Sequence, residues 1–244
     1  AVPGATNKII ARFAKVSAIS FDAVELPNPV LTGNPLRSEI LRFIETDSRN
    51  ETRRELGVGD RKVITAFGGS LGARHLNETI FELSQKWEGE AISIYHIVGS
   101  RDWQDFCQLD RKPVRNVEYE MIEYLKDLTP LIGAADLVIS RAGATSVSEI
   151  TALGIPSILV PLPNSPGGHQ EENARFFERE GSAIVVRDSE LNYVSLSNRI
   201  SLLLTEDLIL KDMAKKAKNS RHLTGGEKIA DLIFEIINGG FDGK

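Results

Sequence analysis

Sulfur chemistry, metal-ligand spacings and long apolar runs are all scarce in this chain of 244 residues. The single cysteine, Cys107, has no disulfide partner, which excludes a disulfide-stapled scaffold and fits a reducing compartment. The four histidines show neither H-E-x-x-H nor Cys/His spacing, so we expect no metal site and no cofactor. No apolar run approaches the roughly 20 residues of a membrane-spanning helix.

An excess of positive charge is also lacking. Lys and Arg number 29 against 34 Asp and Glu, a formal net charge of −5, and such a chain has no global field that attracts nucleic acid. We therefore expect no nucleic-acid partner. The G-x-S-x-G elbow of a serine hydrolase is missing as well.

The first 21 residues contain Lys8, Arg12 and Lys15 but no acidic residue, as in a transit peptide. The basic residues are sparse and the segment has no secretory apolar core, so a piece of a longer protein explains it better. A composition that is 41% hydrophobic and 26% charged is typical of a globular protein, with room for one large α/β domain or two small ones.

Short β-branched runs alternate with helical stretches along the chain, which predicts βαβ units around a parallel sheet. Two of the expected strands carry consecutive apolar residues that must point to opposite faces, so we expect helices to cover both faces of the sheet. The expected strands are 63–67, 92–98, 136–140, 155–160 and 182–186.

Helices are expected between these strands and after the last one. The final helix has the clearest pattern, because apolar residues at Ile229, Leu232, Ile233, Ile236 and Ile237 predict one buried stripe. The likeliest domain seam is 25–35, where three prolines and a glycine interrupt any helix. The other expected helices are 73–87, 146–153, 169–180, 191–204 and 207–218.

The first candidate site is the glycine-rich sequence GGSLGA at 68–73, between an expected strand and an expected helix. Glycines allow close approach of a ligand, and the free N–H groups of a helix start favour an anion such as a diphosphate. The spacing fits neither the G-x-G-x-x-G fingerprint nor a P-loop, which argues against NAD and ATP. A tight turn without a ligand is the alternative.

The second candidate site is a similar strand-to-helix junction at 140–149. Glu149 falls off the apolar stripe of its helix, and its carboxylate could accept hydrogen bonds from two ribose hydroxyls at the carboxyl edge of the sheet. The spacing Ser146-x-x-Glu149 also fits a capping box, in which Glu149 only satisfies the helix start. Spacing alone leaves both interpretations open.

The third candidate site is a loop rich in proline and glycine, 161–168, which leads into a helix that begins with His169 and Gln170. Both side chains can hydrogen-bond a hydroxyl-rich ligand. His169 taken alone is more often a solvated residue at a helix end.

Together these motifs resemble the MurG family, GT-B glycosyltransferases that add N-acetylglucosamine to the lipid-linked muramyl-pentapeptide in peptidoglycan synthesis. The combination is specific, because a bare turn or a capping box would not predict the other motifs. The matching stretches are 6–8, 33–37, 68–74 with Asn77, 135–141, Gly143 with 148–150, 154–156, 160–161, and 169–170 with 173–174.

The resemblance implies a doubly wound parallel sheet with helices on both faces, a Rossmann-like domain of the GT-B fold. Residues 25–244, final helix included, would be the donor-binding domain, and 1–24 the trailing segment of an acceptor domain. By position, Arg37, Ser70 and the amides after it would hold the diphosphate, and the backbone of Leu125 the uracil. The remaining implied contacts are Ala144, Thr145 and Ser146 with the phosphates and ribose, Glu149 with the ribose hydroxyls, and Gln170 with the sugar.

The family's amino-terminal glycine-rich loop and the histidine proposed as general base have no counterpart in this sequence. No catalytic residue is therefore expected among the 244, and we expect UDP-N-acetylglucosamine binding without transfer by this chain alone. The acceptor lipid and the membrane surface would be contacted through the acceptor domain, at the cytoplasmic face of the inner membrane. The alternative is one subunit of a two-chain transferase with a membrane-anchored partner. A nucleotide-sugar epimerase of the same architecture fits less well.

Overall fold

A computed structural model describes residues 3–22, 24–69 and 73–239. Its centre is a six-stranded sheet in which all neighbouring strands are parallel, in the order β5-β4-β3-β6-β7-β8. Counted from β3, this is the strand order of a doubly wound nucleotide-binding fold. The strands are β3 (Lys62–Phe67), β4 (Ile92–Ile97), β5 (Val117–Ile122), β6 (Leu137–Ser140), β7 (Ser157–Leu159) and β8 (Ala183–Val185).

The central strands are buried on both faces, as the consecutive apolar residues predicted. In β3, Ile64 and Ala66 belong to one apolar cluster, whereas Val63 and Phe67 belong to another. Successive side chains of a strand point to opposite faces, so the two clusters are the two sides of the sheet.

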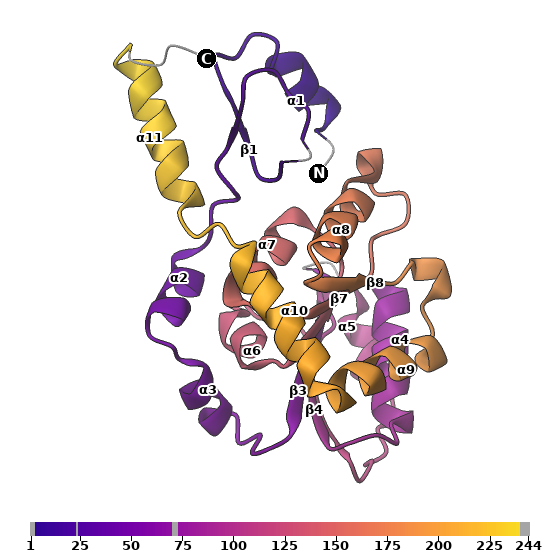
Figure 1. The fold of residues 1–244 in the computed structure, drawn as a ribbon. Coiled ribbons are helices and arrows are strands. Elements are labelled where there is room, and N and C mark those ends of the chain that lie inside the picture. The colour runs from indigo at the N-terminus through magenta and orange to yellow at the C-terminus, as the bar shows by residue number, and fades with distance from the viewer. Residues whose placement is uncertain (1–2, 23, 70–72, 240–244) are drawn as a thin grey trace.

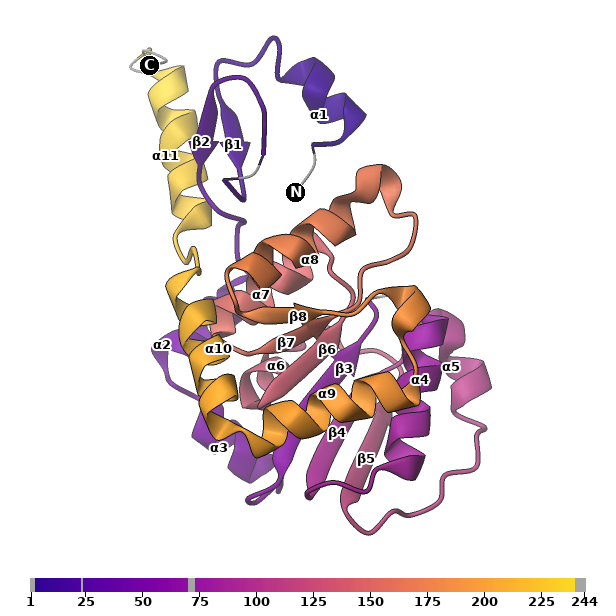
Figure 2. The ribbon, with the colours of Figure 1, turned by 45° about the vertical axis from the view of Figure 1, so that its right-hand side comes forward.

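Helices cover both of these faces (Figures 1 and 2). One cluster is completed by side chains of α4 (Arg74–Lys86), α9 (Tyr193–Thr205) and α10 (Asp207–Asn219). Residues of α2 (Ser38–Glu45), α6 (Thr129–Ala134) and α7 (Ala144–Leu153) complete the other. The expected doubly wound α/β fold is confirmed. The remaining helices include α3 (Arg49–Glu55), α5 (Ser100–Phe106) and α8 (His169–Arg179).

The structure also contains elements that the sequence analysis did not name. The edge strand β5 alternates apolar and charged residues in the sequence VEYEMI, a strand signal that is weaker than a buried run because one face is solvated. Helices α2, α3, α5 and α6 are short, eight residues or fewer, and stand between the strands with few capping signals.

The amino-terminal part forms a small layer of its own beside the sheet. It consists of α1 (Ala5–Ile10) and a pair of parallel strands, β1 (Ser17–Ile19) and β2 (Pro29–Leu31), so part of the predicted seam is a strand. Phe21 is buried and its ring centroid lies 5.1 Å from that of Phe176 and 5.5 Å from that of Phe177 on α8. The segment therefore packs on the larger domain.

The expectation of a buried stripe on the last helix is wrong. Helix α11 (Gly225–Ile237) extends away from the six-stranded sheet (Figures 1 and 2), and Ile233 and Ile237 are 51% and 73% exposed. The apolar period predicts an amphipathic helix correctly, but the described chain does not cover that face. On α1 and the turn after it, Ile9, Ile10 and Phe13 are exposed in the same way. None of the helices in the described residues has the length and apolar character needed to cross a bilayer.

A polar network lies inside the domain, between β4 and α4. The His96 ring nitrogens lie 2.7 Å from the Tyr119 hydroxyl and 3.0 Å from Asn77 Oδ1, while the Asn77 amide donates to Asp102 and to the carbonyl of Val98. Burial lowers the pKa of His96 to about 3 and raises that of Tyr119 above its ordinary value, so both groups stay neutral at pH 7. Asn77, one of the family-matching residues, thus has a structural role.

Loss of stability at mildly acidic pH should follow from His96. The unfolded chain takes up a proton near the ordinary pKa of 6.5 and the folded protein only near 3, so the full stabilisation is present above about pH 6.5 and is lost as the pH falls. We expect the free energy of unfolding to drop by about 1.5 kcal/mol between pH 6.5 and about pH 5, and His96→Gln to lose this drop. Urea titrations at both pH values measure it; equal drops in both proteins would contradict the assignment.

Candidate functional site

The candidate site lies at the carboxyl edge of the sheet, where the chain reverses its winding. Strands β3 and β6 are neighbours, with Phe67 opposite Ser140, and α4 and α7 follow them on opposite faces of the sheet. In doubly wound sheets a crevice forms between two such diverging loops, and ligands bind there. The first two predicted sites therefore meet at one place.

The loop after β3 has a backbone that only glycine fits. A Cβ on Gly68 would lie 2.3 Å from the Cβ of Ala73, and Gly69 has φ +99°. The glycines are thus required by the tight strand-to-helix turn itself. Ser70 lies outside the described residues, so its contact with a diphosphate stays a prediction.

Helix α7 begins two residues earlier than predicted, at Ala144, with Gly143 as its N-cap. Ala144, Thr145 and Ser146 therefore form its first turn, whose N–H groups have no acceptor within the helix and favour an anion. No side chain caps this helix. The capping-box interpretation of Ser146 and Glu149 is wrong, because Ser146 lies inside the helix and Glu149 bonds elsewhere.

The buried carboxylate of Glu149 is held by Arg37 from a distant part of the chain. Arg37 Nε donates to Glu149 Oε1 at 2.7 Å and Nη2 donates to Oε2 at 3.0 Å, a two-pronged ion pair. The hydrogen bonds with Glu149 raise the pKa of Arg37 above its ordinary value. Two residues that were predicted separately, for diphosphate and ribose, thus contact each other directly.

Arg37 also joins the predicted uracil contact to this cluster. Its Nη1 donates to the carbonyl of Lys126 at 3.3 Å, and the preceding residue, Leu125, packs partly buried against the apolar cluster under α7. The structure therefore brings Arg37, Leu125, Glu149 and the start of α7 together on one side of the crevice.

Gln170, at the start of α8, links the loops that border the crevice. Its Oε1 accepts from the N–H of Ala142 at 3.2 Å and from that of Leu162 at 3.0 Å, so only the amide nitrogen is left to donate to a ligand. Asn173 donates to the carbonyl of Ala142 at 2.9 Å, and its buried Oδ1 has no partner in the described residues. A cavity of about 500 Å³ lies beside Gln170, lined by Leu162, Glu171 and Asp188 among others.

A buried ion pair that sequence reasoning missed stands next to these loops. Arg141 Nη1 lies 2.6 Å from Asp188 Oδ1 and donates to the carbonyls of Val160 and Pro161, while His75 Nδ1 lies 3.0 Å from Asp188 Oδ2. Burial alone would raise the pKa of Asp188, but the contacts with His75 and Arg141 outweigh it and lower that pKa. Arg141 belongs to the stretch 135–141, one of those that match the MurG family. Asp188 lies in a short 3₁₀ turn, and no sequence motif marked it as part of a site.

The fold is that of a GT-B glycosyltransferase domain, as in the structures it resembles. Residues 63–229 match the C-terminal domain of glycosyltransferase family 28, and the chain belongs to that family.

Curated relatives carry one name, "UDP-N-acetylglucosamine--N-acetylmuramyl-(pentapeptide) pyrophosphoryl-undecaprenol N-acetylglucosamine transferase". The protein of Acetivibrio thermocellus is 38% identical over 97% of this chain and 65% of its own length. That of Ruminiclostridium cellulolyticum is 37% identical over 97% of this chain and 66% of its own length. The chain thus spans about two thirds of these relatives.

A solved structure of MurG also matches, and together with these relatives it confirms the resemblance to the MurG family. The crystal structure of MurG from Acinetobacter baumannii is 27% identical, with a TM-score of 0.77 over 96% of this chain and 64% of that one. Anabaena HepE, solved with UDP-glucose, is 14% identical with a TM-score of 0.57 over 94% of this chain and 66% of that one, a likeness of fold alone.

Removal of either partner of the Arg37–Glu149 pair should destabilise the fold. Arg37→Leu leaves a buried carboxylate without its donor, whereas the double change Arg37→Leu/Glu149→Leu removes both charges, so the two single losses should not add. Because the Arg37 side chain is 39% exposed, we expect a coupling energy of about 1 kcal/mol rather than that of a fully buried pair. Urea unfolding of the four proteins measures it, and additive effects would show that the pair contributes nothing.

Proposed function

We propose that this chain is the donor-binding part of an inverting transferase that moves N-acetylglucosamine from UDP-N-acetylglucosamine to the lipid-linked muramyl-pentapeptide, at the cytoplasmic face of the membrane. The observation that carries the proposal is the buried Glu149 carboxylate, set one helical turn behind a free helix N-terminus at the sheet's switch point. The names of the relatives support the donor and the acceptor.

In the proposed complex each part of the donor nucleotide has its own contact. In the proposed complex the diphosphate lies against the first-turn N–H groups of Ala144 to Ser146 and the Ser70 loop, with Arg37 beside it. A carboxylate has about four lone-pair positions, and Arg37 uses one on each oxygen of Glu149, which leaves room for the two ribose hydroxyls. The backbone at Leu125 meets the uracil edge, and the Gln170 amide contacts the sugar.

In the proposed transfer the acceptor hydroxyl oxygen bonds to the anomeric carbon while the bond from that carbon to the diphosphate oxygen breaks. UDP leaves with the bonding electrons, and the hydroxyl proton goes to a general base. The positive charge of Arg37 and the start of α7 favour the negative charge that grows on the leaving diphosphate.

We infer that the base is not among these 244 residues. His96 is buried and stays neutral in its hydrogen-bonded network, and His75 lies against Asp188. The ring of His169 faces Gly167, and His222 packs on Gly33. None of these contacts is made with Glu149 or with Gln170.

A two-chain transferase is the second candidate, and the exposed apolar side chains of α1 and α11 favour it. In that case a membrane-anchored partner supplies the acceptor site, and these faces receive it. The reading frame upstream of the Ala1 codon separates the alternatives. An in-frame acceptor domain indicates a single-chain enzyme, and a stop codon followed by a separate partner gene indicates two chains.

Donor binding is tested by the ribose contact. Isothermal titration should show that UDP binds more tightly than 2′-deoxy-UDP, by about tenfold, because the deoxy analogue cannot donate to Glu149. In Glu149→Ala the two ligands should bind equally and weakly, since the carboxylate that distinguishes them is gone.

Glu172→Ala is the matched control, because it removes an exposed carboxylate on α8. It should keep both the affinity for UDP and the preference over the deoxy analogue. No heat from UDP with folded wild-type protein would contradict the proposal, and so would a preference that survives in Glu149→Ala.

The missing base is tested separately. Supplied with UDP-N-acetylglucosamine and the lipid acceptor, this chain should release no more UDP than the same mixture without acceptor, although it binds the donor. Formation of the glycosylated lipid by the purified 244 residues would show that the base lies within them.

A further inference from the structure

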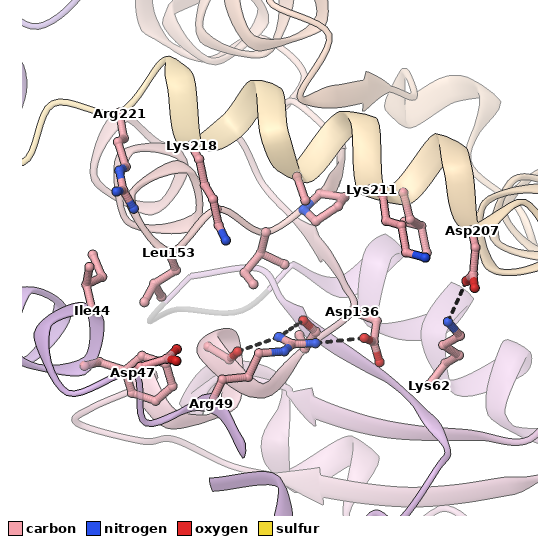
Figure 3. Close-up of a pocket in the computed structure, with 18 residues that line it drawn as sticks. Ile44, Asp47, Arg49, Lys62, Asp136, Leu153, Asp207, Lys211, Lys218 and Arg221 are labelled. Carbon is pink, nitrogen blue, oxygen red and sulfur yellow. Dashed lines mark hydrogen bonds and ion pairs between the residues drawn. The ribbon is translucent and has the colours of Figure 1, made fainter. Parts of the chain in front are cut away.

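A second cavity lies at the opposite end of the sheet from the donor site. It has a volume of about 500 Å³ and is lined where strands begin, by Lys62 at the start of β3, Asp136 before β6 and Pro156 before β7. Helices α2 and α10 form its walls (Figure 3). The donor site uses the carboxyl ends of the same strands, so the two sites are separated by the length of the sheet.

The charges on the floor of this cavity are already paired. Arg49 donates to Asp136 at 2.8 Å and to the carbonyls of Gly133 and Ala135 at 2.6 Å each, and Lys62 bonds Asp207 at 2.9 Å (Figure 3). Burial lowers the pKa of Arg49, and the charge of the neighbouring Arg53 lowers it further. The carboxylate of Asp136 has the opposite effect, but the pKa stays below its ordinary value. The floor therefore carries no unpaired carboxylate that would repel an anion.

Positive charges line the wall formed by α10 and the turn after it. Lys211, Lys218 and Arg221 stand at successive points along this wall (Figure 3), and none of them forms an ion pair within the described residues, although the charge of Lys211 helps to lower the pKa of Asp207. The opposite rim presents one unpaired acid, Asp47. The excess of cations is local, since the whole chain has a net charge of −5.

The rest of the lining is apolar, and two glycines allow side chains to approach the backbone closely. A Cβ on Gly133 would lie 2.3 Å from the Phe43 ring, and one on Gly154 would lie 2.6 Å from Lys218 Cγ, so the Phe43 and Lys218 side chains lie directly on the backbone. Leu153 and Leu210 add further apolar surface. The cavity thus places apolar surface next to three cations spaced along α10 and the turn after it.

We propose that this cavity binds an organic phosphate, with the phosphate at Lys218 and Arg221, Lys211 farther along the same wall, and its apolar part against Phe43 and Leu153. Two neighbouring cations with a third nearby suit a group with more than one negative charge, and the apolar wall suits a ring or hydrocarbon attached to it. The same chemistry is offered by a soluble phosphomonoester and by a phospholipid headgroup. The site is independent of the donor function.

The test compares two variants with the same change in net charge. Lys211→Gln/Lys218→Gln neutralises two cations that line the cavity and keeps the Cβ and Cγ of Lys218, of which Cγ lies on Gly154. Lys215→Gln/Lys228→Gln neutralises two exposed lysines that do not line it. The free energy of unfolding and the affinity for UDP, measured first, should match the wild type in both variants.

The soluble probe is 1-naphthyl phosphate, titrated with the donor site saturated by UDP, and 1-naphthol tests the need for the phosphate. The wild type and the control variant should bind 1-naphthyl phosphate equally, and the cavity variant at least about tenfold more weakly. Flotation with phosphatidylglycerol vesicles, against phosphatidylcholine vesicles, tests the lipid source.

Binding of the naphthyl phosphate without vesicle binding assigns a soluble ligand, and vesicle binding that the cavity variant loses assigns a headgroup. Failure of both probes would overturn the proposal. So would an equal loss in the two variants, which would indicate a nonspecific effect of charge.

Discussion

The pairing of β3 with β6 is the constraint on which the rest of this structure depends. These two strands are far apart in sequence, yet they are neighbours at the centre of the six-stranded sheet, and its other four strands lie outward from them. Crossovers between parallel strands are right-handed, so the chain must cover one face while it moves out from β3 and the other after it passes to β6. The crevice between the loops after Phe67 and Ser140 is a direct consequence, because these loops diverge from adjacent strand ends.

The same winding gives the two ends of the sheet opposite electrostatic character. Helices that follow the strands begin near the carboxyl edge and end near the amino edge, so N–H groups gather at one end and carbonyl groups at the other. At the amino edge, Arg49 and Arg53 donate to the last carbonyls of α6 and its C-cap. At the carboxyl edge, the first turn of α7 is left open. The backbone therefore favours an anion at the carboxyl edge. At the amino edge an anion is favoured only where there are more cationic side chains than the carbonyl groups engage.

The sequence was sufficient to predict five of the six strands of the sheet and the two loops that meet at its switch point, since both depend on local patterns. Buried strands such as β3 have consecutive apolar residues, and the glycines at 68 and 69 mark a turn that no other residue fits. What could not be predicted depends on partners distant along the chain. The spacing Ser146-x-x-Glu149 did not reveal that the carboxylate pairs with Arg37, 112 positions away. The period of α11 gave an amphipathic helix but not whether anything covers it.

The position of Arg37 shows how the core controls the site. Arg37 is the N-cap of α2 and has an extended backbone, with φ −68° and ψ 149°, so its side chain leaves the helix and reaches α7. Helix α2 is anchored by Ile40, which is fully buried against the cluster that also contains Ile132 and Ile150. A guanidinium that must meet both carboxylate oxygens tolerates little displacement, because the two hydrogen bonds share one plane. The packing of Ile40, three residues after Arg37, therefore fixes the position of the guanidinium charge that the donor would meet.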